Sequence, residues 1–543
     1  MGFLSRVEDR PTPKSVYNWR VWVLSFIAAF ASIMIGYDSA FIGGTLALPS
    51  FTKSFGKLNA NTSGNLVSTY QAGAFFGAFL GHPLGHFLGR KKGLFITAVV
   101  FTIGAAIMTA ASPATHLTPI YVGRAIAGLA IGVASNLTPM YIAEIAPAPA
   151  RGQAVGLYEV GWQIGGIVGF FINYGVIQTL PSTVKQWRIP FAVQLVPGGM
   201  LMVGSLFLVE SPRWLLSRGR VEEARQKLSY IRQLPTDDPY FVDEFNQMSL
   251  AIQETKKNAG GDSYFAPFKY LFRQKHLVAR LAFGSSLFAF QNGTGINAIN
   301  YYSPTVFKSL GITGTSTGLL TTGIFGIIKT IGSFVFILFL VETVGRRRLL
   351  IISSSGGAFA MYYIAAYIAI AKPAQHKKSS LDGPGTSALV FFYIWTCFYS
   401  FGWNPLPWVY GSEAFDNTAR PVAQIFMAAS NWLYNFVISQ ATPHMFLRMN
   451  SGVYLFFASC MVLSVFWIFF LMPETKGIPT EEMDNLHAKW PRRHAHALVV
   501  EELRIRAAEC RGEPVLANDG YQPSDSASST EKEDNNQVKL NTA

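Results

Sequence analysis

Charged residues are scarce in this chain of 543 residues. Asp, Glu, Lys and Arg together make up 14% of the sequence, whereas hydrophobic residues make up 50%. Soluble globular domains carry roughly 25% charged residues, which cover the surface that faces water. The shortage of charge therefore excludes an ordinary soluble protein and indicates a chain that is surrounded by lipid.

Cysteine and catalytic motifs are scarce as well. The three cysteines, Cys397, Cys460 and Cys510, lie far apart in the sequence, which argues against a disulfide framework or a metal cluster. No phosphate-binding glycine loop, metal-ligand spacing or nucleophile–base arrangement is recognisable. We therefore expect a protein that is not an enzyme and that holds no metal.

Long apolar runs are what the chain has instead. An α-helix needs about 17–25 mostly apolar residues to cross about 30 Å of hydrocarbon. Twelve runs have this length, at residues 21–46, 66–88, 94–111, 120–142, 154–176, 191–209, 281–302, 319–341, 349–371, 388–410, 422–442 and 453–471. The sequence thus predicts an all-α polytopic membrane protein with twelve transmembrane helices.

The same runs divide the chain into five parts. We expect a leader at 1–20, a six-helix half at 21–209, a linker at 210–280, a second six-helix half at 281–472 and a tail at 473–543. The last part of the tail is polar and biased in composition, which is typical of disorder.

Positive charge indicates the orientation. Basic residues gather in the loops after the second and eighth runs, at 90–92 and 346–348, and in the linker. The positive-inside rule then places both termini in the cytoplasm. The net charge of +13 follows from this distribution and gives no reason to expect nucleic acid as a partner. Asn61, in an Asn-Thr-Ser sequon of the first outer loop, is a candidate for glycosylation.

Three short motifs occur once in each half, in the same order and at nearly constant offset, always at a cytoplasmic helix end. They share these charged residues: Arg90, Glu144, Arg151, Glu210 and Arg213 in the first half, and Arg346, Glu413, Arg420 and Glu474 in the second. Parallel six-helix repeats are the architecture of major facilitator transporters, whose substrate site lies between the halves. The charges are expected to pair across the halves and close the cytoplasmic side. Anchoring of helix ends at the interface is the alternative.

Longer motifs carry a resemblance to a known family. The chain resembles the sugar porter family over residues 18–477, on the motifs GRAIAGLAIG (123–132), EIAPAPARG (144–152), VESPRWL (209–215), GTGINAINYYS (293–303), VGRRR (344–348) and PETKG (473–477). The stretches YQAGAFFGAF and VGWQIGGIVGFFINYG are similar to the quinate permeases of fungi within that family.

This resemblance implies a function. It predicts proton-coupled import of quinate through the plasma membrane by a carrier that acts as a monomer among membrane lipids and needs only protons as coupling ion. A symporter for galacturonate, a hexose or a pentose, or a nutrient sensor that does not transport, are the alternatives.

The resemblance also assigns roles to residues. It implies that substrate is bound by Gln163, Gln291, Asn292, Asn297, Trp408 and Asn431. Amide side chains suit hydroxylated rings because they both donate and accept hydrogen bonds. Gly293 and Gly295 are expected to break the helix, so that Gln291 and Asn297 both face the ligand. Asn300 and Asn435 are either further contacts or structural links between helices.

Coupling and gating residues follow in the same way. Asp38 and Arg124 are isolated charges inside predicted helices and are expected to pair. By resemblance, protonation of Asp38 releases Arg124, although a static ion pair is the alternative. Tyr301 and Tyr302 correspond to the outer gate of the family.

The sequence departs from the family at two positions and leaves one cation unassigned. His86 stands where the family has an acidic residue, whereas the matching position of the second half keeps one, Glu342, as part of the charge network. Asn292 stands where glucose carriers have glutamine, which predicts a role in separating the substrate from glucose. Lys329, inside a predicted helix, is expected either to contact the substrate or to snorkel or bind a backbone carbonyl.

Overall fold

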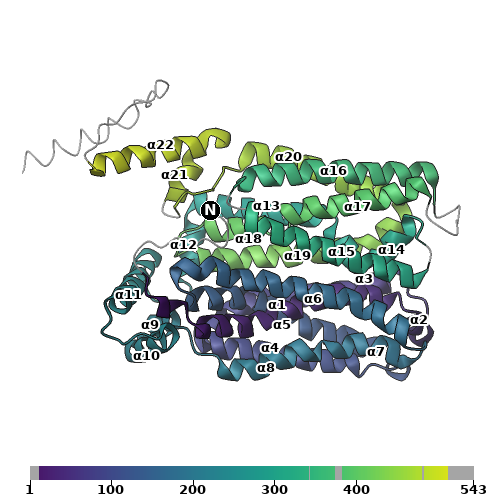
Figure 1. The fold of residues 1–543 in the computed structure, drawn as a ribbon, viewed down its shortest axis with the longest axis horizontal. Helices are drawn as coiled ribbons and strands as arrows, with labels where there is room; N and C mark the ends of the chain where they lie inside the picture. Colours follow the sequence, from purple (N-terminus) through teal and green to yellow (C-terminus); the bar gives the residue numbers. More distant parts are fainter. Residues whose placement is uncertain (1–11, 313, 341–342, 374–381, 480–481, 512–543) are drawn as a thin grey trace, which may run out of the picture.

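The chain folds into two bundles of long, roughly parallel and antiparallel helices that lie side by side (Figure 1). The computed structural model describes residues 12–312, 314–340, 343–373, 382–479 and 482–511. Within these ranges the regular structure is helical and contains no strand. The prediction of an all-α protein is confirmed for these ranges.

The first half forms the bundle in purple and blue (Figure 1). Its helices are α1 (Trp19–Leu46), α2 (Pro49–Phe55), α3 (Ala60–Pro83), α4 (Arg90–Thr109), α5 (Thr118–Ile145), α6 (Arg151–Thr179), α7 (Val184–Val193) and α8 (Leu195–Phe207).

The second half forms the bundle in green (Figure 1). Its helices are α13 (Lys275–Gly293), α14 (Ile296–Ser309), α15 (Thr315–Val335), α16 (Arg346–Ala371), α17 (Gly383–Phe401), α18 (Leu406–Glu413), α19 (Arg420–Met449) and α20 (Gly452–Leu471).

Several helices are interrupted, so one predicted apolar run can correspond to two helices of the structure. Three of the runs each correspond to a pair of helices, α7 with α8, α13 with α14 and α17 with α18. In the described part of the chain, eight helical stretches are long and apolar enough to cross a membrane by themselves. The broken runs α13–α14 and α17–α18 are not among these eight, and they supply much of the site described below.

Glycines let the helices approach each other closely. A Cβ at Gly132 of α5 would lie 2.2 Å from the carbonyl oxygen of Ala74 on α3. A Cβ at Gly43 of α1 would lie 2.3 Å from the carbonyl oxygen of Tyr301 on α14, which belongs to the other half. Small residues allow such backbone contacts between membrane helices. Gly43 therefore sets how closely the two halves approach at this point.

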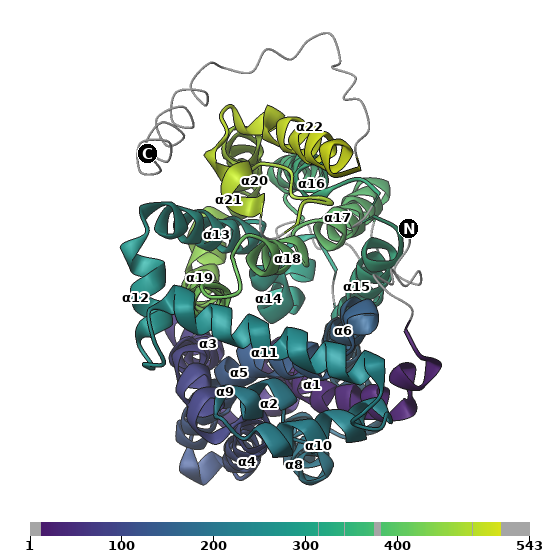
Figure 2. The same ribbon diagram turned by 90° about the vertical axis from the view of Figure 1, so that its left-hand side faces the viewer.

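Further helices cover one end of the molecule, which we call the linker end (Figures 1 and 2). The linker forms α9 (Pro212–Ser217), α10 (Val221–Arg232), α11 (Pro239–Ala259) and α12 (Ala266–Arg273), and the tail forms α21 (Met483–Ala488) and α22 (Arg492–Arg511). Arg232 of α10 ties the linker to the first half, because it donates to the carbonyl of Ile145 of α5. It also pairs with Glu244 of α11, within the linker, at 2.7 Å. The leader before residue 12 and the tail predicted to be disordered lie outside the described residues.

Candidate functional site

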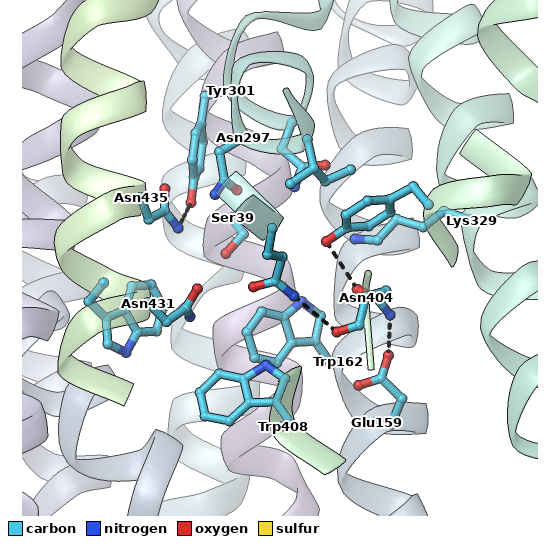
Figure 3. Close-up of a pocket in the computed structure, with 15 residues that line it drawn as sticks. Ser39, Glu159, Trp162, Asn297, Tyr301, Lys329, Asn404, Trp408, Asn431 and Asn435 are labelled. Atoms are coloured by element: carbon cyan, nitrogen blue, oxygen red, sulfur yellow. Dashed lines mark hydrogen bonds between the residues drawn. The ribbon is translucent and has the colours of Figure 1, made fainter. Parts of the chain in front are cut away.

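A cavity with about 560 Å³ of empty space lies between the two halves (Figure 3). Its lining is mostly polar and aromatic: Ser39, Glu159 and Trp162 from the first half, and Gln291, Ile296, Asn297, Asn300, Tyr301, Lys329, Tyr399, Asn404, Trp408, Asn431, Trp432 and Asn435 from the second.

A helix break shapes one wall of the cavity. Helix α13 ends at Gly293, and α14 begins at Ile296 after Gly295, whose φ of +90° lies in the left-handed region. Glycine adopts this conformation without the steric cost that a side chain brings. The predicted break is present, and it allows Gln291 and Asn297, on opposite sides of it, to line the same cavity.

The amides of this wall are fixed by one another and by the backbone. Gln291 donates through Nε2 to the carbonyl oxygen of Trp403 at 2.6 Å. Asn292 donates to the carbonyl of Phe288 at 2.8 Å, and its own Oδ1 accepts from Asn297. These contacts hold the three amides in set orientations.

Indole rings form the apolar surfaces of the cavity. Trp408 lies edge-on to Phe288 with ring centroids 4.8 Å apart, and Trp432 is nearly fully buried. Trp162 adds a third indole from the first half (Figure 3). Flat apolar faces of this kind pack against ring C–H groups, while the surrounding amides bind hydroxyls.

Tyr301, Asn300 and Asn435 line another part of the cavity, and Tyr302 follows Tyr301 in the chain. Asn435 donates to the Tyr301 hydroxyl at 3.4 Å, and the Tyr302 hydroxyl donates to the carbonyl of Ser439 at 2.9 Å. Both tyrosines are buried. The Asn300 Oδ1 is also buried and has no hydrogen-bond partner among the described residues. Asn300 and Asn435 thus line the cavity, which favours the contact role over a purely structural one.

Two charged residues, Glu159 and Lys329, line the cavity (Figure 3). The Glu159 Oε1 accepts from Gln163 at 2.6 Å and from Asn404 at 2.9 Å. The second of these bonds joins the two halves. Lys329 of α15 lines the cavity, with 8% of its surface exposed.

The predicted pair of intramembrane charges is present. Arg124 Nη1 lies 3.2 Å from Asp38 Oδ1, and neither side chain is exposed. Arg124 also donates to the carbonyl of Val67 at 3.1 Å, and its guanidinium lies over the Tyr70 ring. Asp38 Oδ2 has no partner within the described ranges. This carboxylate is therefore incompletely satisfied by hydrogen bonds.

Two of the six predicted substrate residues do not line the cavity. Gln163 lies behind Glu159, and Asn292 lies behind Asn297, each bonded to the residue in front of it. In this arrangement neither residue lines the cavity directly.

The sequence reasoning missed several lining residues, and some of them left a signal. Glu159 is an acid inside the run 154–176, and such residues are candidates for function by default. Asn404 lies between Gly402 and Pro405, which mark the break between α17 and α18. Ser39, Trp162, Tyr399 and Trp432 carried no comparable signal.

The repeated charges pair inside each half at the linker end. Arg90 forms two bonds with Glu144, at 2.8 and 2.7 Å, and Arg346 bonds to Glu413 at 2.8 Å. The prediction of pairs across the halves is not what the structure shows, since each of these pairs joins helices of one half. The physical reason is proximity: Arg90 begins α4 beside the end of α5, and Arg346 begins α16 near the end of α18.

The other predicted members of the network have different places. Arg151 and Arg213 form no ion pair within 4.0 Å among the described residues. Arg420 donates to the carbonyl of Phe415 at 2.8 Å. Glu342 lies outside the described residues.

Asn61 is exposed in the first turn of α3, the helix that Asn59 caps. Helix α2, which precedes α3 in the chain, lies at the end of the bundle opposite the linker end (Figure 1).

Comparisons with known proteins agree on one family. The family described as "Sugar (and other) transporter" matches residues 24–487. The chain is 52% identical over 527 residues to a "Probable quinate permease" of Aspergillus niger, covering 96% of this chain and 97% of the relative. It is 52% identical over 508 residues to the "Quinate permease" of Emericella nidulans, covering 93% and 95%.

Solved structures agree with this family and confirm the predicted all-α polytopic membrane protein with the major facilitator fold. The proton:xylose symporter XylE bound to 6-bromo-6-deoxy-D-glucose superimposes with a TM-score of 0.70 at 28% identity, covering 86% of this chain and 98% of that one. The inward open conformation of the xylose transporter XylE from E. coli gives 0.69 at 26% identity, covering 86% and 99%.

Proposed function

Because this chain belongs to the sugar transporter family, we propose that it imports quinate together with protons by alternating access of the cavity between its halves. It is a multi-pass membrane transporter and not an enzyme. Its substrate is a small molecule of the kind that this family carries.

The observation that carries the proposal is the cavity itself, in which amides and indoles from both broken helices of the second half converge. Quinate is a ring that bears several hydroxyls and one carboxylate. Gln291, Asn297 and Asn431 offer donors and acceptors for the hydroxyls, and Trp408 offers a face for the ring. The relatives named as quinate permeases, at 52% identity over nearly their whole length, support quinate over other hydroxylated rings.

Proton coupling is assigned to Asp38. A buried carboxylate with one free oxygen holds Arg124 only while it is ionised. A proton on Asp38 removes this attraction and leaves Arg124 to its carbonyl and aromatic contacts, so the two protonation states favour different arrangements of α1 and α5. The proton:xylose symporter with the same fold supports this assignment.

The proposal also covers the setting of the protein. We assign it to the plasma membrane as a monomer surrounded by lipid, with both termini in the cytoplasm and with no cofactor besides protons. Tags at each terminus should stay protected from protease added to intact cells. Cleavage of either tag in intact cells would contradict this orientation.

Uptake measurements test the function directly. Transporter-deficient cells that express the chain should accumulate labelled quinate, and a protonophore should abolish accumulation against a gradient. Shikimate, galacturonate and glucose serve as competing substrates. Uptake of glucose or galacturonate without quinate would replace the substrate, and absence of any uptake would favour a nutrient sensor.

A further inference from the structure

One cation at the cavity has no bonded partner. Lys329 is about nine-tenths buried and lines the cavity, and no hydrogen bond or ion pair reaches its ammonium from the residues that the structure describes. An isolated charge at such a depth is costly and is retained in membrane proteins mainly where it has a function. The open donor positions of this ammonium therefore call for a ligand.

The position of Lys329 argues against snorkelling. The residue is the fifteenth of α15, and the helical span Thr315–Leu340 continues for eleven residues beyond it, so Lys329 lies about 21 Å along the axis from the first end and about 16 Å from the second. A lysine that snorkels lies near a helix end and directs its ammonium to the interface. Lys329 instead lies beside Asn404 and above Glu159 in the cavity (Figure 3).

Glu159 offsets the charge of Lys329 without forming an ion pair with its ammonium. The Glu159 charge acts on the Lys329 ammonium, yet no ion pair within 4.0 Å joins the two residues. Gln163 and Asn404 hold Glu159 Oε1 on its own side of the cavity. The empty cavity is thus close to neutral, while the ammonium keeps its hydrogen-bond donors free.

We propose that Lys329 binds the carboxylate of the substrate and makes the cavity selective for hydroxylated ring acids over neutral sugars. This inference rests on the proposed function and deepens it. The ammonium offers three donors and a compact charge, which suits a carboxylate. The amide wall of Gln291, Asn297 and Asn300 then faces the ring hydroxyls. A neutral sugar would leave the buried ammonium without a partner, so the same residue also disfavours the wrong substrate.

Binding to the purified full-length protein tests this assignment without a proton gradient. The indoles of Trp162, Trp408 and Trp432 line the cavity, so their fluorescence reports on occupancy. The probes are quinate, its neutral carboxamide, galacturonate and glucose. The variants are Lys329→Gln, Lys329→Arg and Glu159→Gln. Lys308→Gln is the matched control, because Lys308 is an exposed lysine in the last turn of α14.

We expect the wild type and Lys308→Gln to prefer quinate over its carboxamide. Lys329→Gln should weaken quinate binding about 10- to 150-fold, as expected for a lost hydrogen bond to a charged group, and should leave carboxamide binding unchanged or tighter. Lys329→Arg should retain part of the preference. Glu159→Gln removes the competing negative charge and keeps an oxygen for Gln163 and Asn404, so it should bind quinate at least as tightly as the wild type.

Two results would overturn the assignment. One is a Lys329→Gln protein that binds quinate with wild-type preference over the carboxamide. The other is an equal loss of acids and neutral rings in both Lys329→Gln and Glu159→Gln, which would make the two residues a structural pair. Failure of the proposed function would give a different result. If the wild type binds galacturonate but not quinate, the substrate is galacturonate, and the role of Lys329 is then tested by comparing the binding of acidic rings with that of neutral rings. A wild type that binds only neutral rings refutes both.

Discussion

The two halves of the molecule share a scaffold but contribute unequally to the cavity. The first half supplies Ser39, Glu159 and Trp162, whereas the other twelve of the fifteen lining residues come from the second half. Conversely, the fully buried Asp38–Arg124 pair belongs to the first half. Under the proposed function, this comparison assigns substrate binding mainly to the second half and the response to protons to the first half.

What the halves have kept in common lies at the linker end. Each has a glycine of positive φ, Gly89 or Gly345, immediately before a helix whose first N–H groups bind a carboxylate. Glu210 accepts from the backbone N of Arg90 at 2.8 Å, and Glu474 accepts from that of Arg346 at 2.8 Å. An anion at a helix N-terminus is stabilised by unpaired N–H groups and the helix dipole. This device stiffens each half separately.

The largest effect is expected from substitution of Asp38, the residue to which we assign proton coupling. Asp38→Asn carries no charge, so Arg124 loses its ionic partner in every state and protonation no longer distinguishes two arrangements. Accumulation of quinate against a gradient should be abolished, while binding and exchange persist. Uptake and counterflow in vesicles measure the two, with Asp262→Asn, an exposed residue, as control. Undiminished accumulation would remove Asp38 from coupling.

The next effect concerns the binding side. Gln291→Ala removes a cavity amide and leaves the carbonyl of Trp403 without its donor. Substrate binding should weaken by about 1–3 kcal/mol, as for a buried group left unpaired. Titration of tryptophan fluorescence measures it, and Gln247→Ala on exposed α11 is the matched control. Unchanged affinity would give Gln291 a structural role only.

A smaller effect should distinguish Glu210 from Glu474, the carboxylates that bind the first N–H groups of α4 and α16. Glu474 accepts from four backbone N–H groups, of Arg346, Arg347, Thr475 and Lys476, whereas Glu210 accepts from those of Arg90, Lys91 and Ser211. Both Glu474→Gln and Glu210→Gln should destabilise the protein by about 1–2 kcal/mol.

The apparent melting temperature of the purified protein should therefore fall in both variants, and further for Glu474→Gln. A larger drop for Glu210→Gln would show that the count of N–H donors does not govern this contact.

The smallest effect is a pH dependence limited to the tail of the second half. Burial of His487, together with the charge of Arg280, lowers its pKa from the usual 6.5 to about 3. His487 therefore binds a proton when α21 is detached from the second half but not when α21 is packed against it, which we call docked. Docking is strongest above pH 6.5 and weakens as the pH falls from 6.5 towards 3.

Hydrogen exchange of α21, compared at pH 7.5 and 5.5 after correction for intrinsic rates, should rise at the lower pH. His487→Gln should remove the difference. The linker helices α9–α12 contain no histidine and provide an internal reference. Equal loosening of α21 in the wild type and in His487→Gln would exclude this residue as the cause.

Sequence reasoning succeeded where the chemistry is local. Isolated charges in apolar runs predicted that Asp38 and Arg124 meet, and two glycines predicted the break before α14. It failed where the answer depends on which helix ends are neighbours. The repeated charges were expected to pair across the two halves, yet Glu144 pairs with Arg90 of the same half.

The broken run α17–α18 shows the same limit. Residues 388–410 read as one apolar span, so Asn404 was not expected to bond to Glu159 of the other half. Likewise, the sequence could not tell that Gln163 and Asn292 stand behind the cavity wall. Distance along the chain does not determine depth behind a surface.

The buried charges around the cavity have an electrical consequence. Asp38 offsets Arg124, and Glu159 offsets Lys329, so these four side chains sum to zero. Each unbalanced charge that crosses the full membrane potential changes the free energy by about 2.3 kcal/mol per 100 mV. One monovalent acid anion that travels with one proton adds no net charge. Under the proposed function with this stoichiometry, membrane voltage would do no work on either the empty or the loaded carrier, and the pH difference alone would drive accumulation.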